Sequence, residues 1–525
     1  MGQSLIDHLE ASARRGASLT MLGKKGDETR THSELVEEAK VFGAALQARG
    51  IGPGSRVGIV AVSSFDFVLA LLSTFAAEAC AVLLPQPPLL AGAAYKDQVT
   101  ALARNTRVAA TLGPATAAAV DVPHINLEEL ASGGTLDAAD LDGEGMIQFT
   151  SGTTGDPRAV LLSRHRIAAR VVADSARPDY DTESDVLLSW RDLSTSAGIF
   201  PGLLTPLGMG VPSVVMSTAV FRAAPERWLI EISRRRVTVS GGPNFAYVAA
   251  TRSLTSTSET LDLSCWRLAE CAGERIDAAS IEGFVEAAAP HGFDPASIVC
   301  IYGMTEAGIV SISPRAGLRT QEVSEQALIE DRVEPASDED DAARVVSLGH
   351  VRDGVSVRIV DASGEGLEQP AVGEVAVRTP WLTLGYLKGT DTHLPTTDEH
   401  LLTGDRGYIS NDELFLTGRS KNVIIIRGRN YNGEDLERAL HDLPGLVSSG
   451  IAVVGRSTEE TEELVVFAET HADGAERDEL PTRINERLWR SFNLSAKEVV
   501  LMDPDTLPRN STGKLRREEL KASLR

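Results

Sequence analysis

The sequence predicts an α/β protein with a large N-terminal domain of layered α/β sheets plus a small β subdomain, followed by a small mobile α+β C-terminal domain. The first reason is length, because 525 residues exceed what one hydrophobic core supports. The second is a repeated alternation of strand-like and helix-like segments, which is typical of a parallel sheet with helices on both faces. The alternation starts anew near residue 420, so we expect 1–420 to form the N-terminal domain and 421–525 the C-terminal domain.

The expected elements follow from apolar periodicity. A helix over 33–50 ends at Gly50, and a strand, a helix and a strand follow at 57–62, 65–77 and 81–84. Further strands are expected at 186–189, 211–216, 237–240 and 298–301, with a helix at 224–234. Strands at 355–360, 373–378, 408–409 and 414–416 predict the β subdomain. For the C-terminal domain we expect strands at 423–426, 451–454 and 463–469 and helices at 433–443 and 481–492.

Acidic charge is the most distinctive feature of the composition. The formal net charge is −23, which argues against broad nucleic-acid binding and against stable adsorption to anionic membranes. Charge rises and periodicity fades over 315–345, most clearly from Glu330 to Asp341. This segment is therefore expected to be an exposed insertion or a mobile loop.

The cellular compartment is inferred from what the sequence lacks. The first residues contain no basic segment followed by an apolar core, so no signal peptide is expected. The apolar stretch 57–85 is interrupted by Asp66 and Glu78 and is better explained by strand, helix and strand than by a membrane span. The four cysteines lack zinc-site spacing and are expected to be reduced thiols, mostly buried, in a cytoplasmic protein.

The loop 150–160 carries the strongest local signal. Hydroxyl residues alternate with two glycines, and the cation Arg158 follows. Glycine permits close approach of backbone N–H groups, while hydroxyls and a guanidinium supply further donors to phosphate oxygens. The pattern differs from a Walker loop and is expected to bind a polyphosphate. The residues expected to do so are Thr150, Ser151, Gly152, Thr153, Thr154, Gly155 and Arg158.

Five motifs in this order resemble those of the adenylate-forming superfamily, which includes acyl-CoA synthetases, peptide-synthetase adenylation domains and luciferases. They are the loop 150–160, Tyr302-Gly303-Met304-Thr305-Glu306, Thr403-Gly404-Asp405, Gly418-Arg419-Ser420-Lys421, and the segment 507–514. The stretches 225–229, 239–247 and 425–431 and the insertion 327–351 resemble the fatty acyl-AMP ligases more closely. This resemblance covers nearly the whole chain.

The resemblance implies a nucleotide site for ATP and Mg²⁺. Glu306 would hold Mg²⁺, and Thr305 would hydrogen-bond the α-phosphate. Asp405 would accept both ribose hydroxyls, and Arg419 would reach the same sugar. The walls around the adenine would come from Ala272, Gly273, Glu274, Tyr302 and Gly303.

The resemblance also assigns the catalytic and moving parts. Lys514 on the C-terminal tip would stabilise the charge that grows between the carboxylate and the α-phosphate, together with Thr305 and Glu306. Lys421 would be the hinge of the C-terminal domain.

The acyl segment departs from the family pattern. Relatives carry a His-Asp pair where this chain has Thr195 and Ser196. The expected acyl-site residues are Thr195, Ser196, Gly198, Asn244 and Phe245. The acid could be a shortened alkyl acid, an aryl acid or an unusual small acid.

The acceptor is expected to be the phosphopantetheine thiol of an acyl carrier protein, with coenzyme A less favoured. The alternatives are an acyl-CoA synthetase, or a ligase that passes the adenylate to a nitrogen nucleophile. A non-catalytic nucleotide-binding protein is disfavoured by the presence of Thr305, Glu306, Asp405 and Lys514 together.

Overall fold

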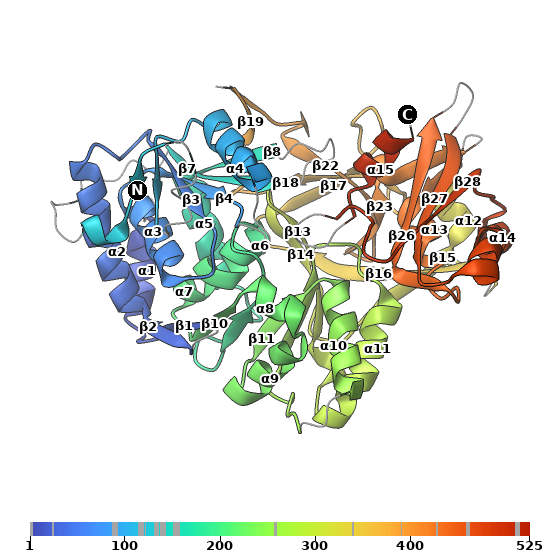
Figure 1. Ribbon diagram of the computed structural model, residues 1–525, viewed down its shortest axis with the longest axis horizontal. Helices are drawn as coiled ribbons and strands as arrows, with labels where there is room; N and C mark the ends of the chain where they lie inside the picture. Colours follow the sequence, from blue (N-terminus) through green and yellow to red (C-terminus); the bar gives the residue numbers. More distant parts are fainter. Residues whose placement is uncertain are drawn as a thin grey trace.

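The computed structural model describes most of the chain. The described residues are 4–23, 26–86, 93–113, 120, 122–130, 136, 143–150, 158–256, 260–338, 341–389, 391–426, 429–457, 462–509 and 515–524. Helices and strands alternate through the first three hundred residues, and the mixed α/β class predicted from the sequence is confirmed. Figure 1 shows the elements after residue 420 gathered at one end of the molecule.

An eight-stranded sheet forms the first layer of the large part. Its central strands β3, β4 and β7 run parallel, as predicted, because each follows a crossover that includes a helix or a long connection. The strand order is β20 (Asp391–His393), β19 (Gly385–Lys388), β8 (Arg158–Ser163), β7 (Glu144–Thr150), β4 (Cys80–Leu84), β3 (Arg56–Val60), β5 (Ala110–Leu112) and β6 (His124–Ile125).

A fifteen-stranded sheet forms the second layer. Its main order is β17 (Ser356–Val360), β18 (Gly373–Arg378), β22 (His400–Ser410), β23 (Glu413–Arg419), β16 (Ala342–Val351), β14 (Gly308–Ile312), β13 (Ile298–Met304), β12 (Leu268–Ala272), β11 (Val239–Gly242), β9 (Leu187–Ser189), β10 (Ser213–Met216), β1 (Ser18–Leu22) and β2 (Glu28–Thr31). Two short strands join at its side, β15 (Thr320–Ser324) on β16 and β21 (Thr396–Thr397) on β22. The strands predicted as a β subdomain are the antiparallel end of this sheet, since β16 pairs with both β14 and β23.

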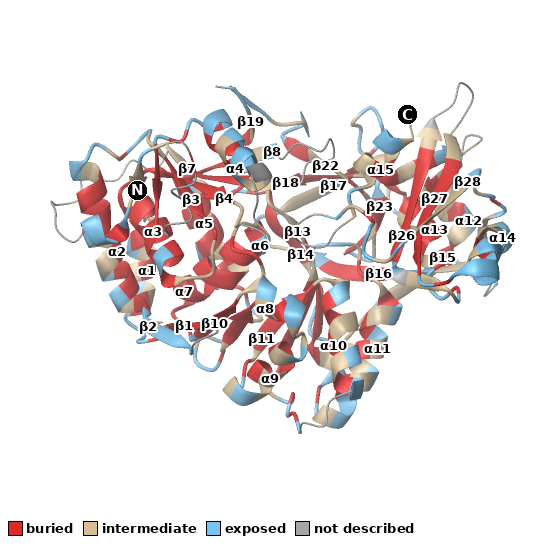
Figure 2. Cartoon of the chain, viewed as in Figure 1, coloured by how far each residue is buried: buried red, intermediate tan, exposed pale blue. Residues whose placement is uncertain are grey.

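Helices cover these sheets and bury their apolar sides (Figure 2). The predicted helix at 65–77 is observed as α3, which Ser64 caps through the backbone N–H of Phe67. The helices of the large part are α1 (Leu5–Ala13), α2 (His32–Ala48), α3 (Phe65–Ala76), α4 (Ala93–Asn105), α5 (Arg164–Ser175), α6 (Ser196–Ile199), α7 (Thr205–Met209), α8 (Thr218–Ala223), α9 (Glu226–Arg235), α10 (Asn244–Ser256), α11 (Ala278–Ala288) and α12 (Glu325–Ile329). Among the described residues, none of the helices combines the length and apolar character that crossing a bilayer requires. The four cysteines are free thiols, and only Cys265 is not fully buried.

The segment 315–345 is more ordered than its composition predicts. It forms β15, the short helix α12 and the start of β16, with β15 and β16 paired in antiparallel register. Val323, Ala327 and Val345 are buried, and these few apolar contacts were too widely spaced to give a periodic signal. The expectation of an unstructured excursion is therefore wrong for 320–329.

The elements after residue 420 have sheets and hydrophobic clusters of their own. They are β24 (Val423–Ile426), β25 (Arg429–Asn432), α13 (Gly433–Arg438), β26 (Leu446–Ser457), β27 (Glu462–Thr470), α14 (Gly474–Phe492), β28 (Glu498–Met502) and α15 (Arg517–Ser523). The predicted helix start at Pro481 is wrong, because α14 begins at Gly474 and contains that proline. Its buried stripe of Leu480, Ile484 and Leu488 outweighs the one backbone hydrogen bond that proline removes.

Candidate active site

Asp405 is the most tightly held carboxylate among the predicted site residues. The pairing of β22 with β23 sets Arg419 opposite it, and the Arg419 Nε lies 2.7 Å from Asp405 Oδ1. The Tyr302 hydroxyl donates a hydrogen bond of 2.8 Å to Asp405 Oδ2. Each carboxylate oxygen keeps further lone pairs, so a ribose can still donate to both. The structure therefore brings together three predicted residues from three distant motifs.

The electrostatics of this cluster follow from burial and charge. Asp405 is only 4% exposed, whereas half of the Arg419 side chain is accessible. The charge of Asp405 raises the pKa of Arg419. Burial, and then the charge of Asp405, raise the pKa of Tyr302 well above its ordinary value. Tyr302 consequently stays a neutral hydrogen-bond donor at physiological pH.

The turn between β13 and β14 presents Gly303, Thr305 and Glu306. The pairing of these strands shifts register between Tyr302 and Gly303. A Cβ at Gly303 would lie 2.6 Å from the Gly308 carbonyl oxygen, so only glycine fits this close approach. Thr305 and Glu306 are half-buried at the tip, where their side chains can meet a ligand.

Glu306 is held by a residue that no sequence motif identified. The hydroxyl of Tyr386 on β19 donates a hydrogen bond of 2.8 Å to Glu306 Oε1. The guanidinium carbon of Arg158, the first residue of β8, lies 5.2 Å from the centre of the Tyr386 ring. The phosphate loop and the Glu306 turn therefore meet through Tyr386, which the pairing of β19 with β8 places there.

The fit of Mg²⁺ rests on these donors. Mg²⁺ prefers carboxylate oxygens together with phosphate and water, and Glu306 offers a second carboxylate oxygen beside the one that Tyr386 contacts. The described residues contain no group of three or more His, Cys, Asp and Glu side chains that could hold a metal ion alone. A site completed by substrate phosphates is consistent with this composition.

Several predicted site residues lie outside the described part of the chain. They are Ser151, Gly152, Thr153, Thr154, Gly155 and Lys514. Thr150 ends β7, where it pairs directly with Arg158 on β8. The two ends of the phosphate loop are therefore adjacent.

The end of β12 and the start of α10 form another wall. Ala272 ends β12, and Gly273 follows with a φ of +95° that favours glycine, before the exposed Glu274. The Asn244 Nδ2 donates 2.7 Å to the Arg275 carbonyl, and its Oδ1 accepts from the Asp277 backbone N–H at 3.1 Å. Asn244 thus positions the loop after β12, and the predicted contact of Asn244 with the acid stays a prediction.

Thr195, Ser196 and Gly198 are held by contacts within the acyl segment. Thr195 caps α6 through the Gly198 N–H at 3.1 Å. The Ser196 hydroxyl accepts 3.0 Å from the Arg170 Nη2, and Arg170 is buried with its guanidinium carbon 3.6 Å from the Phe200 ring centre. Phe245 is 40% exposed and packs edge-on against Trp190. Two hydroxyls and a buried cation therefore lie in the segment that is expected to shape the acyl site.

Lys421 is the middle residue of a short 3₁₀ helix, Ser420–Asn422, that follows β23. Burial, and then the charge of Arg419, lower the pKa of Lys421 to about 8. Its backbone carbonyl accepts a 3.4 Å hydrogen bond from the Lys521 ammonium of α15. The residue thus lies between the large sheet and the C-terminal elements, where a hinge is expected.

Comparisons with known proteins agree with this geometry. Residues 9–387 match the family model described as AMP-binding enzyme. The chain is 29% identical to the medium-chain-fatty-acid–[acyl-carrier-protein] ligase JamA of Moorena producens, over 98% of this chain and 94% of that protein. It is 28% identical to the long-chain-fatty-acid–AMP ligase FadD26 of Mycobacterium marinum, over 93% and 90% of the two chains. A solved structure from work on fatty acyl-adenylate ligases of E. coli and L. pneumophila aligns with a TM-score of 0.90 at 26% identity, covering 100% of this chain and 98% of that one.

The chain therefore belongs to the family of AMP-binding enzymes, the adenylate-forming ligases. Within that family its similarity is to fatty acyl-AMP ligases, which confirms the resemblance seen in the motifs. It is an enzyme that uses ATP to activate a carboxylic acid as an acyl adenylate.

Asp405→Ala should weaken ATP binding by about 1–3 kcal/mol, because buried ribose hydroxyls would lose their acceptor. Calorimetric titration with a non-hydrolysable ATP analogue measures this loss. Asp353→Ala, which removes an exposed carboxylate from a turn of the same sheet, is the matched control and should bind normally. Equal affinity of both variants would show that Asp405 does not contact the nucleotide.

Tyr386→Phe should raise the KM for Mg·ATP roughly tenfold, since a hydrogen bond to a charged group contributes about 1.5 kcal/mol. The phenyl ring retains the stacking with Arg158, so the variant isolates the hydroxyl. Steady-state kinetics at several Mg²⁺ concentrations measure the effect. Tyr95→Phe, which removes a hydroxyl bonded to the Pro85 carbonyl, is the control, and an equal KM in both variants would contradict a role for Tyr386.

Proposed function

We propose that this ligase forms an acyl adenylate from ATP, with Mg²⁺ on the phosphates, and passes the acyl group to the phosphopantetheine thiol of a carrier protein. A carboxylate oxygen attacks the α-phosphorus, and pyrophosphate leaves. The thiolate then attacks the acyl carbonyl, and AMP leaves. The observation that carries the first step is the buried Asp405, whose two oxygens face Tyr302 and Arg419.

The residues of this chain divide the work of the first step. Asp405 and Arg419 orient the ribose. The phosphates are bound by Thr150, by Arg158 and by the loop between these two residues. Thr305 donates a hydrogen bond to the α-phosphate. Mg²⁺ held by Glu306 supplies charge neutralisation at the phosphates. Lys514 supplies a cation where negative charge grows during attack.

The second step needs a movement of the unit 421–525. We assign this movement to a hinge at Lys421, because that residue joins β23 to the first C-terminal element. The acceptor that can enter depends on how freely the unit turns.

The choice of a carrier protein over coenzyme A rests on contacts of the insertion 327–351. Ile329 packs against the C-terminal hydrophobic cluster that includes Tyr431 and Leu436. Asp331 forms an ion pair with Arg406 of the large sheet and accepts a 3.2 Å hydrogen bond from Asn430 of the C-terminal unit. The insertion thus contacts both parts at once and opposes their rotation.

One relative supports the same acceptor, because the Moorena producens protein is named as a ligase for an acyl carrier protein. A protein of Caulobacter vibrioides that is 28% identical is named as a putative acyl-CoA synthetase and supports the other acceptor. An acyl-CoA synthetase is the second candidate, because it shares every nucleotide-binding residue discussed above.

Lys514→Ala should abolish adenylate formation and leave the fold intact. A transition-state contact of this kind typically contributes on the order of 10²–10³ in rate. ATP–pyrophosphate exchange measures adenylation, and circular dichroism checks the fold. Lys497→Ala, an exposed lysine of the same unit, is the control. Exchange at the wild-type rate in a folded Lys514→Ala variant would refute the assignment.

The wild-type enzyme should acylate a phosphopantetheinylated carrier protein and transfer little to coenzyme A. The double variant Ile329→Ala, Asp331→Ala should gain coenzyme A acylation, because it removes the apolar and polar contacts that oppose rotation. Glu334→Gln is the matched control, since that side chain pairs only with Arg332 of the same segment. Thioester formation is quantified by mass spectrometry. Efficient coenzyme A acylation by the wild type would favour the synthetase instead.

A further inference from the structure

A small cavity lies between the central strands of the large sheet and the segment that follows α6. Its volume is about 10 Å³, which is room for one water-sized group. The wall comes from β9, β11 and β12, with Pro201 facing them. Half of the residues that line the cavity carry polar side chains, namely Tyr180, Ser189, Arg191, Ser240 and Glu270, and the others are apolar residues or glycine.

The two carboxylate oxygens of Glu270 differ, because one forms hydrogen bonds and the other forms none with the described residues. Its Oε1 lies 2.8 Å from the Arg177 Nη1 and accepts from the Tyr180 hydroxyl at 3.3 Å. Its Oε2 faces the Arg191 Nη1 at 4.0 Å, which is too long for a hydrogen bond. The Glu270 side chain is 5% exposed and that of Arg191 14%.

Arg191 has little else to bind. Within the described chain, the contact with Glu270 is its side chain's one ion pair, and no side-chain hydrogen bond joins Arg191 to another described residue. A mostly buried guanidinium with five donors normally finds several acceptors. The gap between Arg191 and Glu270 Oε2 therefore lacks a group that accepts from the first and donates to the second.

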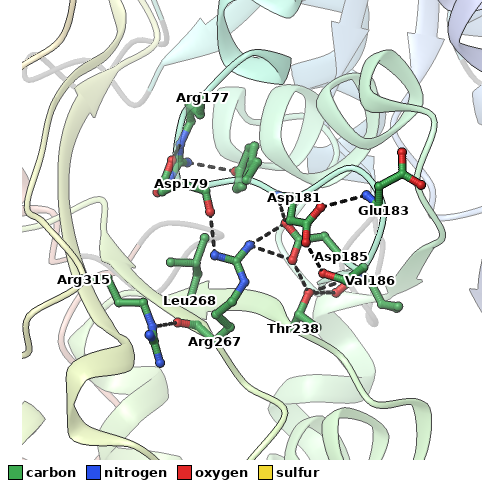
Figure 3. A network of polar contacts seen from close by, with 12 residues as sticks. Arg177, Asp179, Asp181, Glu183, Asp185, Val186, Thr238, Arg267, Leu268 and Arg315 are labelled. Carbon is green, nitrogen blue, oxygen red and sulfur yellow. Dashed lines mark hydrogen bonds and ion pairs between the residues drawn. The ribbon is translucent and has the colours of Figure 1, made fainter.

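The walls of this gap are fixed by a polar network (Figure 3). Arg177 forms two hydrogen bonds with the Asp179 carboxylate. Arg267 donates 2.6 Å to the Asp179 carbonyl and 2.7 Å to each Asp185 oxygen. These bonds fasten the loop between α5 and β9 to the start of β12, so Arg177 and Tyr180 cannot easily turn away from Glu270.

The cavity-lining residue Glu270 lies on β12, two residues before Ala272, which is expected to border the adenine. Side chains alternate along a strand, so Glu270 and Ala272 of β12 lie on the same face of the sheet. Their Cα atoms are separated by two residue steps, roughly 7 Å. Ala272 pairs with Ile301, which precedes the adenine residue Tyr302. Arg191 lies four residues before Thr195 in the acyl segment. A short acid bound with its carboxylate at the nucleotide would direct its far end toward the gap.

The charges around the cavity balance. Two guanidinium groups, Arg177 and Arg191, face two carboxylates, Asp179 and Glu270. A charged substrate group buried here would leave one charge uncompensated, at a large cost. A neutral group with both a donor and an acceptor would satisfy both partners.

We propose that Arg191 and Glu270 select a short carboxylic acid whose far end carries a hydroxyl, a neutral group of about the size of water that both donates and accepts. This inference rests on the proposed adenylation at the same site and names its substrate class. Among the three kinds of acid left open by the sequence, it selects a small polar one.

The test measures kcat/KM in ATP–pyrophosphate exchange for acids of one length. The acids are valerate, 5-hydroxyvalerate, glutarate monoamide and glutarate. We expect 5-hydroxyvalerate to exceed valerate at least about tenfold, and glutarate to be the poorest. Glutarate monoamide, whose carboxamide is larger than a water-sized space, should fall below 5-hydroxyvalerate. A preference for valerate or glutarate would overturn the inference, and the cavity would then hold only water.

Variants assign the selectivity to the two side chains. Arg191→Leu and Glu270→Gln should each reduce the preference for the polar acid over valerate at least about tenfold, mainly through KM. The double variant Arg191→Leu, Glu270→Leu should invert the preference, which is a gain that misfolding cannot produce. Arg315→Gln, at the far side of the network in Figure 3, is the control and should keep the wild-type preference.

The outcomes separate this inference from the proposed function. Exchange with no acid tested, in a protein that binds ATP, would refute adenylation of short acids and this inference with it. Exchange that favours valerate equally in the wild type and in Arg191→Leu would refute the inference alone. A preference lost in both single variants and kept in Arg315→Gln would support it.

Discussion

The contact on which the nucleotide site depends is the pair of bonds that Asp405 makes with Tyr302 and Arg419. It joins β13 to the antiparallel end of the large sheet, segments about a hundred residues apart in the chain. The register of β22 and β23 sets Arg419 opposite Asp405, and a slip by one residue would turn one side chain to the other face. Tyr386 has a similar role at Glu306, because the pairing of β19 with β8 brings it there.

Local signals were sufficient for much of the fold. The apolar runs of β3, α3 and β4 predicted a parallel unit, and β3 and β4 are observed as parallel neighbours. The resemblance of the motifs to a known family implied one nucleotide site for Tyr302, Asp405 and Arg419, and the structure brings these residues together. Tyr386 was not predicted, because its position depends on a pairing between strands more than two hundred residues apart. Asn244 is predicted to contact the acid, and its amide also supports the loop after β12 through contacts that no local pattern encodes.

In the acyl segment, the two residues that depart from the family pattern form hydrogen bonds with neighbouring groups of this chain. Thr195 caps α6, and the Ser196 hydroxyl accepts a hydrogen bond from Arg170. Arg170 is fully buried, and burial, as the largest cause, lowers its pKa to about 10, so it remains charged at neutral pH. Asp174 and the face of Phe200 partly compensate for its lost hydration. The guanidinium of Arg170 therefore contacts this segment, for which the sequence alone indicated only two small hydroxyl side chains.

Arg419 and Lys421 are two residues apart, and this short spacing would couple nucleotide binding to the proposed movement of the C-terminal unit. Arg419 contacts the carboxylate expected to bind ribose, while Lys421 begins the connection to the C-terminal unit. If the unit turns at Lys421 as proposed, the end of β23 moves with it and the contact between Arg419 and Asp405 changes. Linkage makes such coupling reciprocal: a carrier protein that favours one orientation changes the affinity for nucleotide, and the nucleotide changes the affinity for the carrier by the same factor. Release of AMP and departure of the loaded carrier would then be thermodynamically connected through a single strand end.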